Sequence, residues 1–469
     1  MLLALAIAFI YAVTIRAGHE WGDDFAMYIL QAKHITEGQW SAPVEYIYNP
    51  ALPAMGPPAY PPLFPLLLAP IYGMFGMDLR LMKMEQVLFL AAAFYFLFEL
   101  SRTKLGSKPP LLLVAVSAAS PYLWQAKEHI TSDIPFLFFC FLALILIAKN
   151  EQTEWQNLKL ALSAGVVTYL CFATRTVGIA LLPPLVAQAL LKRRCHRNNA
   201  LSAGLACLLF IVHWLVFRSK GSYIDQLSGI LRSIPHNIQI HSWNLARLYL
   251  AGNGSFGLFL FVVFVILFAV GFVRQCRVNP GSPEAFFLCY GGVILLWPSD
   301  NDPRFLLPLF PLAVIYAGIA LAELPRARSR WVTAVLVACL SMNYMIGYRH
   351  STTKSITEGI GDPDFVRMCN FLTANTSRDS VVVFSKPRLL GLLTGRRASA
   401  YRDAAPTSEL TGYLGRIKAS YILQYDGFES DRQYLAEYLT HHARSVSEVL
   451  RYGQYHLYTV QAAGLPSGD

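Results

Sequence analysis

The stretch "IPFLFFCFLALILI", residues 134–147, decides the fold class of this chain. It carries no charged residue, and apolar runs of the same kind recur along the 469 residues. The composition agrees, because 55% of the residues are hydrophobic and 14% are charged, whereas soluble domains carry about 25% charged residues. A long uncharged run of this kind crosses the hydrocarbon core of a bilayer as a helix. The sequence therefore predicts an α-helical polytopic membrane protein.

About eleven membrane-spanning helices are predicted from these runs. They lie at about 1–17, 81–101, 109–126, 134–149, 158–173, 177–191, 200–218, 255–273, 284–298, 304–323 and 331–348. The run at 61–76 is short and opens with two prolines, so we expect it to lie at the membrane interface. The first 16 residues lack a basic n-region and an A-x-A cleavage site, which predicts an uncleaved first helix.

Lys and Arg divide unequally between alternate loops. One set of loops carries Arg102, Lys104, Lys108, Lys149, Lys159, Lys192, Arg193, Arg194, Arg197, Arg274, Arg277, Arg326, Arg328 and Arg330. The short loops of the other set carry Lys127, Arg175 and Arg304. Because Lys and Arg concentrate in cytoplasmic loops, the first set is predicted to face the cytoplasm. Residues 18–80, the loop near 127–133 and the stretch 219–254 then face outward.

The tail, residues 350–469, is also predicted to lie on the outer face, after a transmembrane domain at 1–349. It is polar enough to be soluble. "SVVVFS" and "ASYILQY" predict strands, "DRQYLAEYLTHH" predicts a helix, and "YGQYHLYTV" predicts a late strand after a turn at Gly453. A small α/β domain fits this pattern. It has no glycine-rich phosphate loop, so we do not expect a nucleotide site.

Charge and cysteine usage exclude several classes of function. The net charge of +10 comes from Lys and Arg in short loops, and no nucleic-acid-binding motif is present. We therefore expect membrane lipids, and no nucleic acid, among the partners. The eight cysteines show no CxxC and no His/Cys ligand spacing, which argues against a disulfide framework and a zinc site.

The stretch "GDDFAMYILQAKHITEG", residues 22–38, places two adjacent aspartates just after the first predicted span. Residues 24–37 can form a helix whose apolar face includes Phe25, Tyr28 and Ile29, so we expect it to lie in the membrane surface. Asp23 or Asp24 could cap its N-terminus. A cap needs one carboxylate, and the second needs water, a cation or a substrate proton near a bilayer.

Further charged residues fall on the same predicted face. Asp133 precedes the fourth span, with Lys127 and His129 one or two turns away, and Arg304 stands at the entry to the tenth span. Each also has a structural interpretation: Asp133 as a helix cap, the loop residues as a solvated rim, and Arg304 as a side chain that reaches lipid headgroups. Otherwise Arg304 is a cation well placed for a lipid-linked phosphate.

Five stretches carry a resemblance when taken in order. They are "GDDFAMYILQAKHITEG", "AYPPLFPLLLAPIYGMFG", "TSDIPF", "ATRTVGIALLPPL" and "DPRFLLPLFPL". The series resembles the GT-C membrane glycosyltransferases, and it is most similar to the bacterial branch related to protein O-mannosyltransferases and the lipid A aminoarabinose transferase. The resemblance covers about 15–325. It implies the inner membrane of a bacterium, and transfer of a sugar from a polyprenyl-phosphate carrier to a glycolipid, polysaccharide or protein acceptor.

The resemblance also implies roles for individual residues. Asp23 and Asp24 match the acidic pair that contains the catalytic carboxylate, and Asp133 matches an aspartate that helps to bind donor or metal. Some relatives have a lysine before the two prolines, where this chain has Tyr60. The donor phosphate would then rely on Arg304, Lys127 or His129. Arg175 aligns with an arginine of similar context, and it could equally be part of a structural hinge.

The predicted chemistry suits these residue types. A carboxylate can take the proton of the attacking hydroxyl, and partial desolvation is expected to raise its pKa toward neutrality. The leaving phosphate needs an arginine or a metal. A divalent ion held by Asp24 and Asp133 is one option, although two carboxylates do not define a metal site. We expect one direct displacement with inversion, by analogy with the family.

Other classes of function remain open at this stage. A transporter would place charges mid-span and repeat its halves, whereas the spans here are nearly uncharged and no repeat is apparent. A non-catalytic membrane scaffold or a degenerate family member is a second alternative, because Tyr60 replaces a family lysine. A phosphoethanolamine transferase would need a threonine nucleophile and a zinc cluster, and neither is visible.

Overall fold

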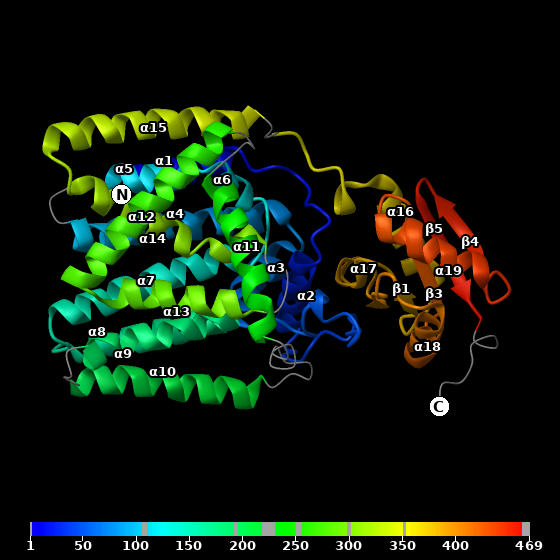
Figure 1. Ribbon diagram of the computed structural model, residues 1–469. Helices are drawn as coiled ribbons and strands as arrows, with labels where there is room; N and C mark the ends of the chain where they lie inside the picture. The colour runs from blue at the N-terminus through cyan, green and yellow to red at the C-terminus, as the bar shows by residue number, and fades with distance from the viewer. Residues whose placement is uncertain are drawn as a thin grey trace.

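The computed structural model describes residues 2–105, 110–191, 196–217, 230–249, 255–297, 302–349 and 353–461. Its larger part is a bundle of helices, and a smaller α/β tail stands at one end of the bundle (Figure 1). The predicted fold class, a helical membrane protein with a small C-terminal α/β domain, is confirmed. Lys108, Lys192, Arg193 and Arg194 of the predicted cytoplasmic loops lie outside the described residues.

The bundle contains the apolar runs as helices. They are α1 (Leu2–Val13), α4 (Leu79–Leu105), α5 (Leu111–Ala118), α6 (Pro121–Ala126), α7 (Asp133–Gln152), α8 (Leu158–Thr174), α9 (Leu182–Leu191), α10 (Arg197–Val216), α12 (Ser255–Val278), α13 (Ser282–Leu296), α14 (Leu309–Ala322) and α15 (Arg326–Arg349). Short 3₁₀ turns, η2 (Thr176–Leu181) and η4 (Pro303–Leu306), precede α9 and α14. Each predicted span therefore falls on helical structure.

Five of these helices are long and apolar enough by themselves to cross a membrane: α4, α7, α10, α12 and α15. The other predicted spans form shorter helices of fewer than 18 residues. The run at 109–126 is divided into α5 and α6, because Pro121 starts a new helix after Ser120 adopts an extended conformation. Proline cannot continue a helix whose earlier carbonyls need its N–H, so the break falls there.

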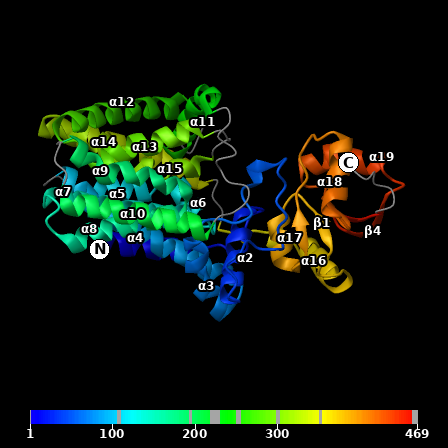
Figure 2. The same ribbon diagram turned by 90° about the horizontal axis from the view of Figure 1, so that it is seen from below.

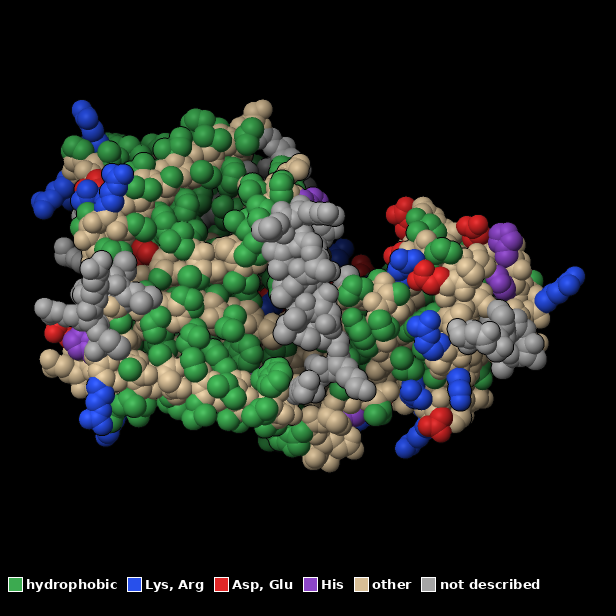
Figure 3. Space-filling model, turned by 60° about the horizontal axis from the view of Figure 1, so that its bottom comes forward, with side chains coloured by type: hydrophobic (Ala, Val, Ile, Leu, Met, Phe, Trp, Pro, Cys, Tyr) green, Lys and Arg blue, Asp and Glu red, His purple; other side chains and the backbone are tan. Residues whose placement is uncertain are grey.

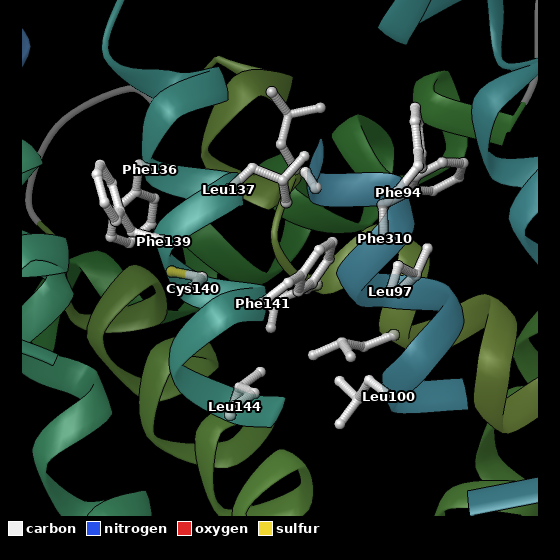
Figure 4. Packing of buried hydrophobic residues seen from close by; sticks show 14 of the residues in the cluster. Phe94, Leu97, Leu100, Phe136, Leu137, Phe139, Cys140, Phe141, Leu144 and Phe310 are labelled. Carbon is white, nitrogen blue, oxygen red and sulfur yellow. The ribbon is translucent and has the colours of Figure 1, made fainter. Parts of the chain in front are cut away.

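The bundle is held by apolar packing. Phe94, Leu97 and Leu100 of α4 face Phe141 and Leu144 of α7 within one large buried cluster (Figure 4). All five side chains are at most 1% exposed. Close packing of these side chains fixes the positions of the helices relative to one another.

Ion pairs and hydrogen bonds bring several of the connections between helices together at one end of the bundle. Lys104 lies 2.8 Å from Glu284, and Arg274 lies 2.8 Å from Glu323, so the ends of α4, α12 and α14 adjoin the start of α13. Asn198 donates to the carbonyl of Trp155 and joins two more connections at this end. Lys and Arg side chains project from the bundle end that is remote from the tail, and hydrophobic side chains cover its flank (Figure 3). The described members of the predicted basic set therefore lie on one end.

The opposite end carries α2 (Asp24–Thr36), α3 (Leu63–Phe75) and α11 (Ile230–Tyr249). α3 has 13 residues and lies beside α2 at this end instead of among the long helices (Figures 1 and 2). The expected position of α2 in the membrane surface stays a prediction, but its apolar face packs within the protein. Nine of its 13 residues are buried, because α3 covers one side and the tail covers another. The helix α11 lies within the predicted outer stretch 219–254 and was not expected.

The tail contains a five-stranded sheet in the order β2-β1-β3-β5-β4. The strands are β1 (Val381–Val383), β2 (Arg397–Ser399), β3 (Tyr421–Tyr425), β4 (Val446–Tyr452) and β5 (Tyr455–Val460). β2, β1 and β3 are parallel, while β5 and β4 are antiparallel. The helices are α16 (Pro363–Asn375), α17 (Pro387–Thr394), α18 (Thr407–Ile417) and α19 (Ala436–His441), with a π-helical turn at Asp431–Leu435 before α19. The three predicted strands and the predicted helix are confirmed.

The outer loop adds an extended segment to the edge of this sheet. Tyr46 forms a parallel bridge with Ala398 of β2. The N–H of Ala398 donates to Glu45 O at 2.7 Å, and the N–H of Ile47 donates to Ala398 O at 2.8 Å. A second contact joins the N–H of Ile356 to Ala17 O at 2.8 Å. The tail is therefore attached to the loop by backbone hydrogen bonds as well as by the chain itself.

At Gly271, α12 packs directly against the backbone of α14, and replacement of this glycine should destabilise the bundle. A Cβ at this position would lie 1.8 Å from Tyr316 O. We expect Gly271→Ala to cost about 1–3 kcal/mol, as overpacking does, and to lower the midpoint of thermal unfolding in detergent. Gly292→Ala is the control, because a Cβ there meets nothing within 4 Å. Equal midpoints for the two variants would contradict this packing.

Candidate functional site

The carboxylate of Asp24 is the centre of a charged network at the tail end of the bundle. Its Oδ1 accepts hydrogen bonds from the Tyr60 hydroxyl at 2.5 Å and from Nη1 of Arg388 at 3.2 Å. Its Oδ2 accepts one from Nη1 of Arg304 at 2.9 Å. The side chains of Asp24 and Arg304 are 28% and 33% exposed, whereas that of Arg388 is 1% exposed. Asp24 and Arg304 are therefore the accessible pair.

Asp23 performs a different task from its neighbour. It occupies the N-cap position of α2, yet its side chain makes no capping hydrogen bond there. Its Oδ1 instead accepts from the backbone N–H groups of Arg388 at 3.1 Å and Leu389 at 3.2 Å. These N–H groups belong to the first turn of α17, where a carboxylate is favoured by unpaired donors and the helix dipole. The predicted cap is thus made to a helix of the tail.

Arg304 links the acidic pair to the loop before α7. Its Nη1 lies 3.9 Å from Oδ2 of Asp133, and Asp133 also pairs with Arg175 at the end of α8. The side chain of Asp133 is 6% exposed. Acidic and basic groups therefore alternate through the site. The interpretation of Asp133 as a helix cap is wrong, because Ser132 occupies the N-cap position of α7 and Asp133 is its first helical residue.

Aromatic side chains form one wall beside Asp24. The rings of Tyr28 and Tyr60 are stacked, with centroids 4.7 Å apart. The hydroxyl of Tyr28 lies 2.7 Å from Oγ of Ser132, next to Asp133. The backbone N–H of Tyr60 donates to Oε1 of Gln31 at 3.0 Å, which fixes the proline-rich loop against α2. Tyr60 is thus placed at the site, as predicted.

Lys127 and His129 have different surroundings. Lys127 is fully buried, and its ammonium pairs with Glu128 and lies 3.9 Å above the Trp124 ring. Glu128 also pairs with Lys83 at 2.9 Å, so Lys127 belongs to a buried ion-pair cluster, which favours a structural role. His129 is half-buried and lies edge-on to His19, with ring centroids 6.0 Å apart. Burial lowers the pKa of His129, so it is neutral at pH 7.

The two adjacent aspartates differ in their acidity. Burial is the largest influence on Asp23 and raises its pKa to about 6, although Arg388 and the N–H of Leu389 act in the opposite direction. Burial also acts to raise the pKa of Asp24, but Arg304, Arg388 and Tyr60 outweigh it and lower the pKa to about 2. The expected rise toward neutrality therefore holds for Asp23 and is wrong for Asp24, because two guanidinium groups stabilise its charge.

The suggested metal site fits this arrangement poorly. Asp24 and Asp133 both face Arg304, so a guanidinium stands where a cation held by the two carboxylates would lie. Among the residues that the structure describes, no group of three or more His, Cys, Asp or Glu side chains is placed to hold a metal ion. Metal binding by Asp24 and Asp133 stays a prediction that requires Arg304 to move away.

Arg388 is the site residue that the sequence analysis missed. It is separated from Asp24 by 364 positions along the chain, in the tail that was predicted to be a small α/β domain. Its guanidinium also lies over the rings of Tyr46 and Tyr60, at 4.7 and 5.0 Å from their centroids. Arg388 is far from any predicted span end, and no local pattern in "SKPRLLGL" distinguishes it from the other arginines of the tail.

Comparison with known proteins finds one family and several solved structures. The family model for dolichyl-phosphate-mannose-protein mannosyltransferases matches residues 59–217. No curated protein matches the chain in sequence. The crystal structure of ArnT from Cupriavidus metallidurans bound to undecaprenyl phosphate has a TM-score of 0.58 and 16% identity, covering 100% of this chain and 99% of that one.

Two further similar structures are longer than this chain. The archaeal oligosaccharyltransferase AglB from Archaeoglobus fulgidus, in complex with an inhibitory peptide and a dolichol-phosphate, has a TM-score of 0.60 and 12% identity over 90% of this chain and 69% of that one. The arabinofuranosyltransferase AftD from Mycobacteria has a TM-score of 0.55 and 13% identity over 98% of this chain and 40% of that one. These likenesses, at low identity, are likenesses of fold.

Replacement of Asp23 should loosen the tail. Asp23→Ala removes the acceptor of two backbone N–H groups and one of the carboxylates that face the buried Arg388. Removing one partner of a buried ion pair typically costs about 3–5 kcal/mol. We expect faster proteolytic cleavage between α15 and α16 in the intact protein. Asp379→Ala, at an exposed position of the tail, is the control and should leave the cleavage rate unchanged.

Proposed function

We propose that this chain, which has the GT-C fold of the membrane glycosyltransferases, transfers a sugar from a polyprenyl-phosphate carrier to an acceptor at the outer face of a bacterial inner membrane. The acceptor classes are a glycolipid, a polysaccharide or a protein. The observation that carries the proposal is the accessible pair of Asp24 and Arg304, 2.9 Å apart, at the tail end of the bundle. A carboxylate and a cation are the two groups that such a transfer requires.

The proposed step is a single displacement at the anomeric carbon. The acceptor oxygen forms a bond to this carbon, the bond from the carbon to the phosphate oxygen breaks, and the configuration inverts. The acceptor proton passes to the Asp24 carboxylate, and the electron pair of the broken bond stays on the departing polyprenyl phosphate. A positioned proton acceptor contributes about 10²–10⁴-fold to such a rate, and a fixed cation stabilises the leaving phosphate.

Arg304 is the proposed partner of the donor phosphate. Its guanidinium is the accessible cation of the network, and a planar guanidinium matches a phosphate bidentately. A phosphate bound there would compete with Oδ2 of Asp24 for Nη1 of Arg304. Asp24 would lose one of the two guanidinium groups that keep its pKa near 2, and its basicity would rise when the donor is in place. Donor binding and activation of the base are thereby coupled.

The proposed sidedness follows from the two ends of the bundle. The described Lys and Arg of the predicted cytoplasmic loops lie at one end, and the Asp24 network lies at the other. The positive-inside rule then assigns the network and the tail to the outer side of the membrane. A polyprenyl chain cannot leave the bilayer, so an acidic site at the end of an apolar bundle is where a lipid-borne sugar phosphate meets a water-side acceptor.

Release of free carrier is the direct test of this function. Purified full-length protein would be incubated with labelled polyprenyl-phosphate forms of mannose, arabinofuranose and aminoarabinose, with a membrane extract as acceptor source. We expect free polyprenyl phosphate to appear with at least one donor, and Asp24→Asn to reduce the rate about 100-fold or more. Asp78→Asn is the matched control, because Asp78 caps α4 in the same outer loop and asparagine caps equally well. Equal rates for both variants would favour a scaffold.

The fall of kcat/KM at acidic pH should follow protonation of Asp24. Asp24 has a depressed pKa, so its negative charge persists until the pH falls below the ordinary range of an aspartate. We expect kcat/KM to hold down to about pH 4 and the acid limb to move upward in Arg304→Gln, which lacks the stabilising charge. A limb near pH 6 that disappears in Asp23→Asn would instead identify Asp23 as the proton acceptor.

A further inference from the structure

The tail delivers one side chain into the Asp24 network, and this side chain is almost completely buried. Arg388 is the second residue of α17 and is 1% exposed. Its backbone N–H is fixed by Asp23, while its guanidinium extends from the sheet domain to Asp24 and Tyr60. A buried arginine is retained only where most of its donors find acceptors, so the destination of each N–H is informative.

The nitrogen atoms of the Arg388 guanidinium contact both the Asp24 network and the backbone of the outer loop. Nη1 contacts Asp24 at 3.2 Å and the Tyr60 hydroxyl at 2.7 Å. Nη2 donates to the carbonyl of Met55 and lies 3.4 Å from that of Pro57, and Nε lies 3.6 Å from Oδ2 of Asp23. A planar five-donor group can reach all of these at once, whereas the point charge of a lysine cannot. One side chain therefore connects both aspartates with the proline-rich loop.

The two oxygens of Asp24 consequently have different partners. Oδ1 is held by Arg388 and Tyr60, which come from the tail and the outer loop. Oδ2 is held by Arg304, which comes from the η4 turn before α14 and is 33% exposed. An anion that takes Arg304 releases Oδ2, while Oδ1 keeps both its donors. Oδ2 is thus the oxygen that becomes available to an incoming proton.

We propose that Arg388 is a positioning residue through which the C-terminal tail completes the active site of the bundle. This inference rests on the proposed function and adds a requirement to it. The guanidinium fixes Oδ1 of Asp24, so that Oδ2 faces the reacting hydroxyl. Displacement of a reacting group by about 1 Å can cost about 100-fold in rate. Without Arg388, Oδ1 of Asp24 keeps only the Tyr60 hydroxyl as a donor, and the carboxylate is free to rotate by that much.

The test compares two buried arginines of the same tail in the full-length protein. Arg396 is 7% exposed, and its described hydrogen bonds go to Thr373, Thr376 and Thr394, all within the tail. Arg396→Ala therefore removes a buried arginine without touching the carboxylates. Thermal unfolding of each variant sets an assay temperature at which both remain folded. Steady-state release of polyprenyl phosphate from the donor that the unaltered protein uses then gives kcat and KM.

We expect Arg388→Ala to lower kcat about 100-fold, with little change in the donor KM. Arg396→Ala should lower kcat by less than about 3-fold, and Arg388→Lys should recover part of the loss because its ammonium can reach Asp24 alone. Undecaprenyl phosphate serves as the binding probe. Its stabilisation of the protein should persist in Arg388→Ala and disappear in Arg304→Ala.

Several results would overturn the inference. Equal losses of kcat in Arg388→Ala and Arg396→Ala would reduce Arg388 to a stabiliser of the tail. Loss of undecaprenyl phosphate binding in Arg388→Ala would make it a donor-binding group instead. Full activity of Arg388→Ala beside an inactive Asp24→Asn would contradict the inference and leave the proposed function standing. Inactivity of the unaltered protein with every donor would contradict the proposed function, and the inference with it.

Discussion

A carboxylate that stays ionised at the end of an apolar bundle needs cationic partners, and Asp24 takes them from two distant parts of the chain. Arg304 comes from the entry to α14, and Arg388 comes from the tail. Each ion pair near the bilayer is costly to leave incomplete, because the remaining charge is poorly solvated. The bundle, the outer loop and the tail are therefore constrained to meet at this one group.

The same constraint explains why the outer loop and the tail share a core. One buried cluster combines Phe25 and Phe64 of the loop helices with Phe365, Val382 and Leu389 of the tail. Loop backbone extends the sheet at Ala398, so part of the loop is a structural element of the tail domain. The same cluster also contains Met82 of α4 and Ile130, so the loop, the tail and the end of the bundle pack as one continuous core.

The sequence predicts the parts of this fold that depend on local pattern. Apolar runs predict the helices, and alternating or β-branched runs predict β1, β3 and β5, because burial of one face is written into consecutive residues. Pro121 breaks a run that looks continuous by hydropathy alone. The helix α11 carries a polar face, so it leaves no apolar run to detect. The surroundings of α2 depend on the tail, which no pattern within residues 24–37 records.

The candidate site also has a part that the sequence predicts and a part that it does not. Asp24, Tyr60, Asp133 and Arg304 were predicted to act together, and the structure brings them into one network. The GT-C resemblance on which their roles rest agrees with the fold. Arg388 could not be predicted, because its role arises from the packing of α17 on Asp23 and from nothing near it in sequence. Lys127 was predicted to belong to the site because of its charge and its position in an outer loop. In the structure it is buried and pairs with Glu128.

Two adjacent aspartates are needed because one carboxylate cannot both anchor the tail and accept a proton from the substrate. A carboxylate that binds the N-terminus of α17 must be buried and immobile, whereas a proton acceptor must present an oxygen to the substrate. Asp23 meets the first requirement with both N–H groups on its Oδ1, and Asp24 meets the second with Oδ2 turned toward the partly exposed Arg304. Successive positions at a helix start point in different directions, so a single turn of chain can serve the tail on one side and the bundle on the other. The pair is therefore best understood as one structural anchor and one reactive group, joined by the guanidinium of Arg388.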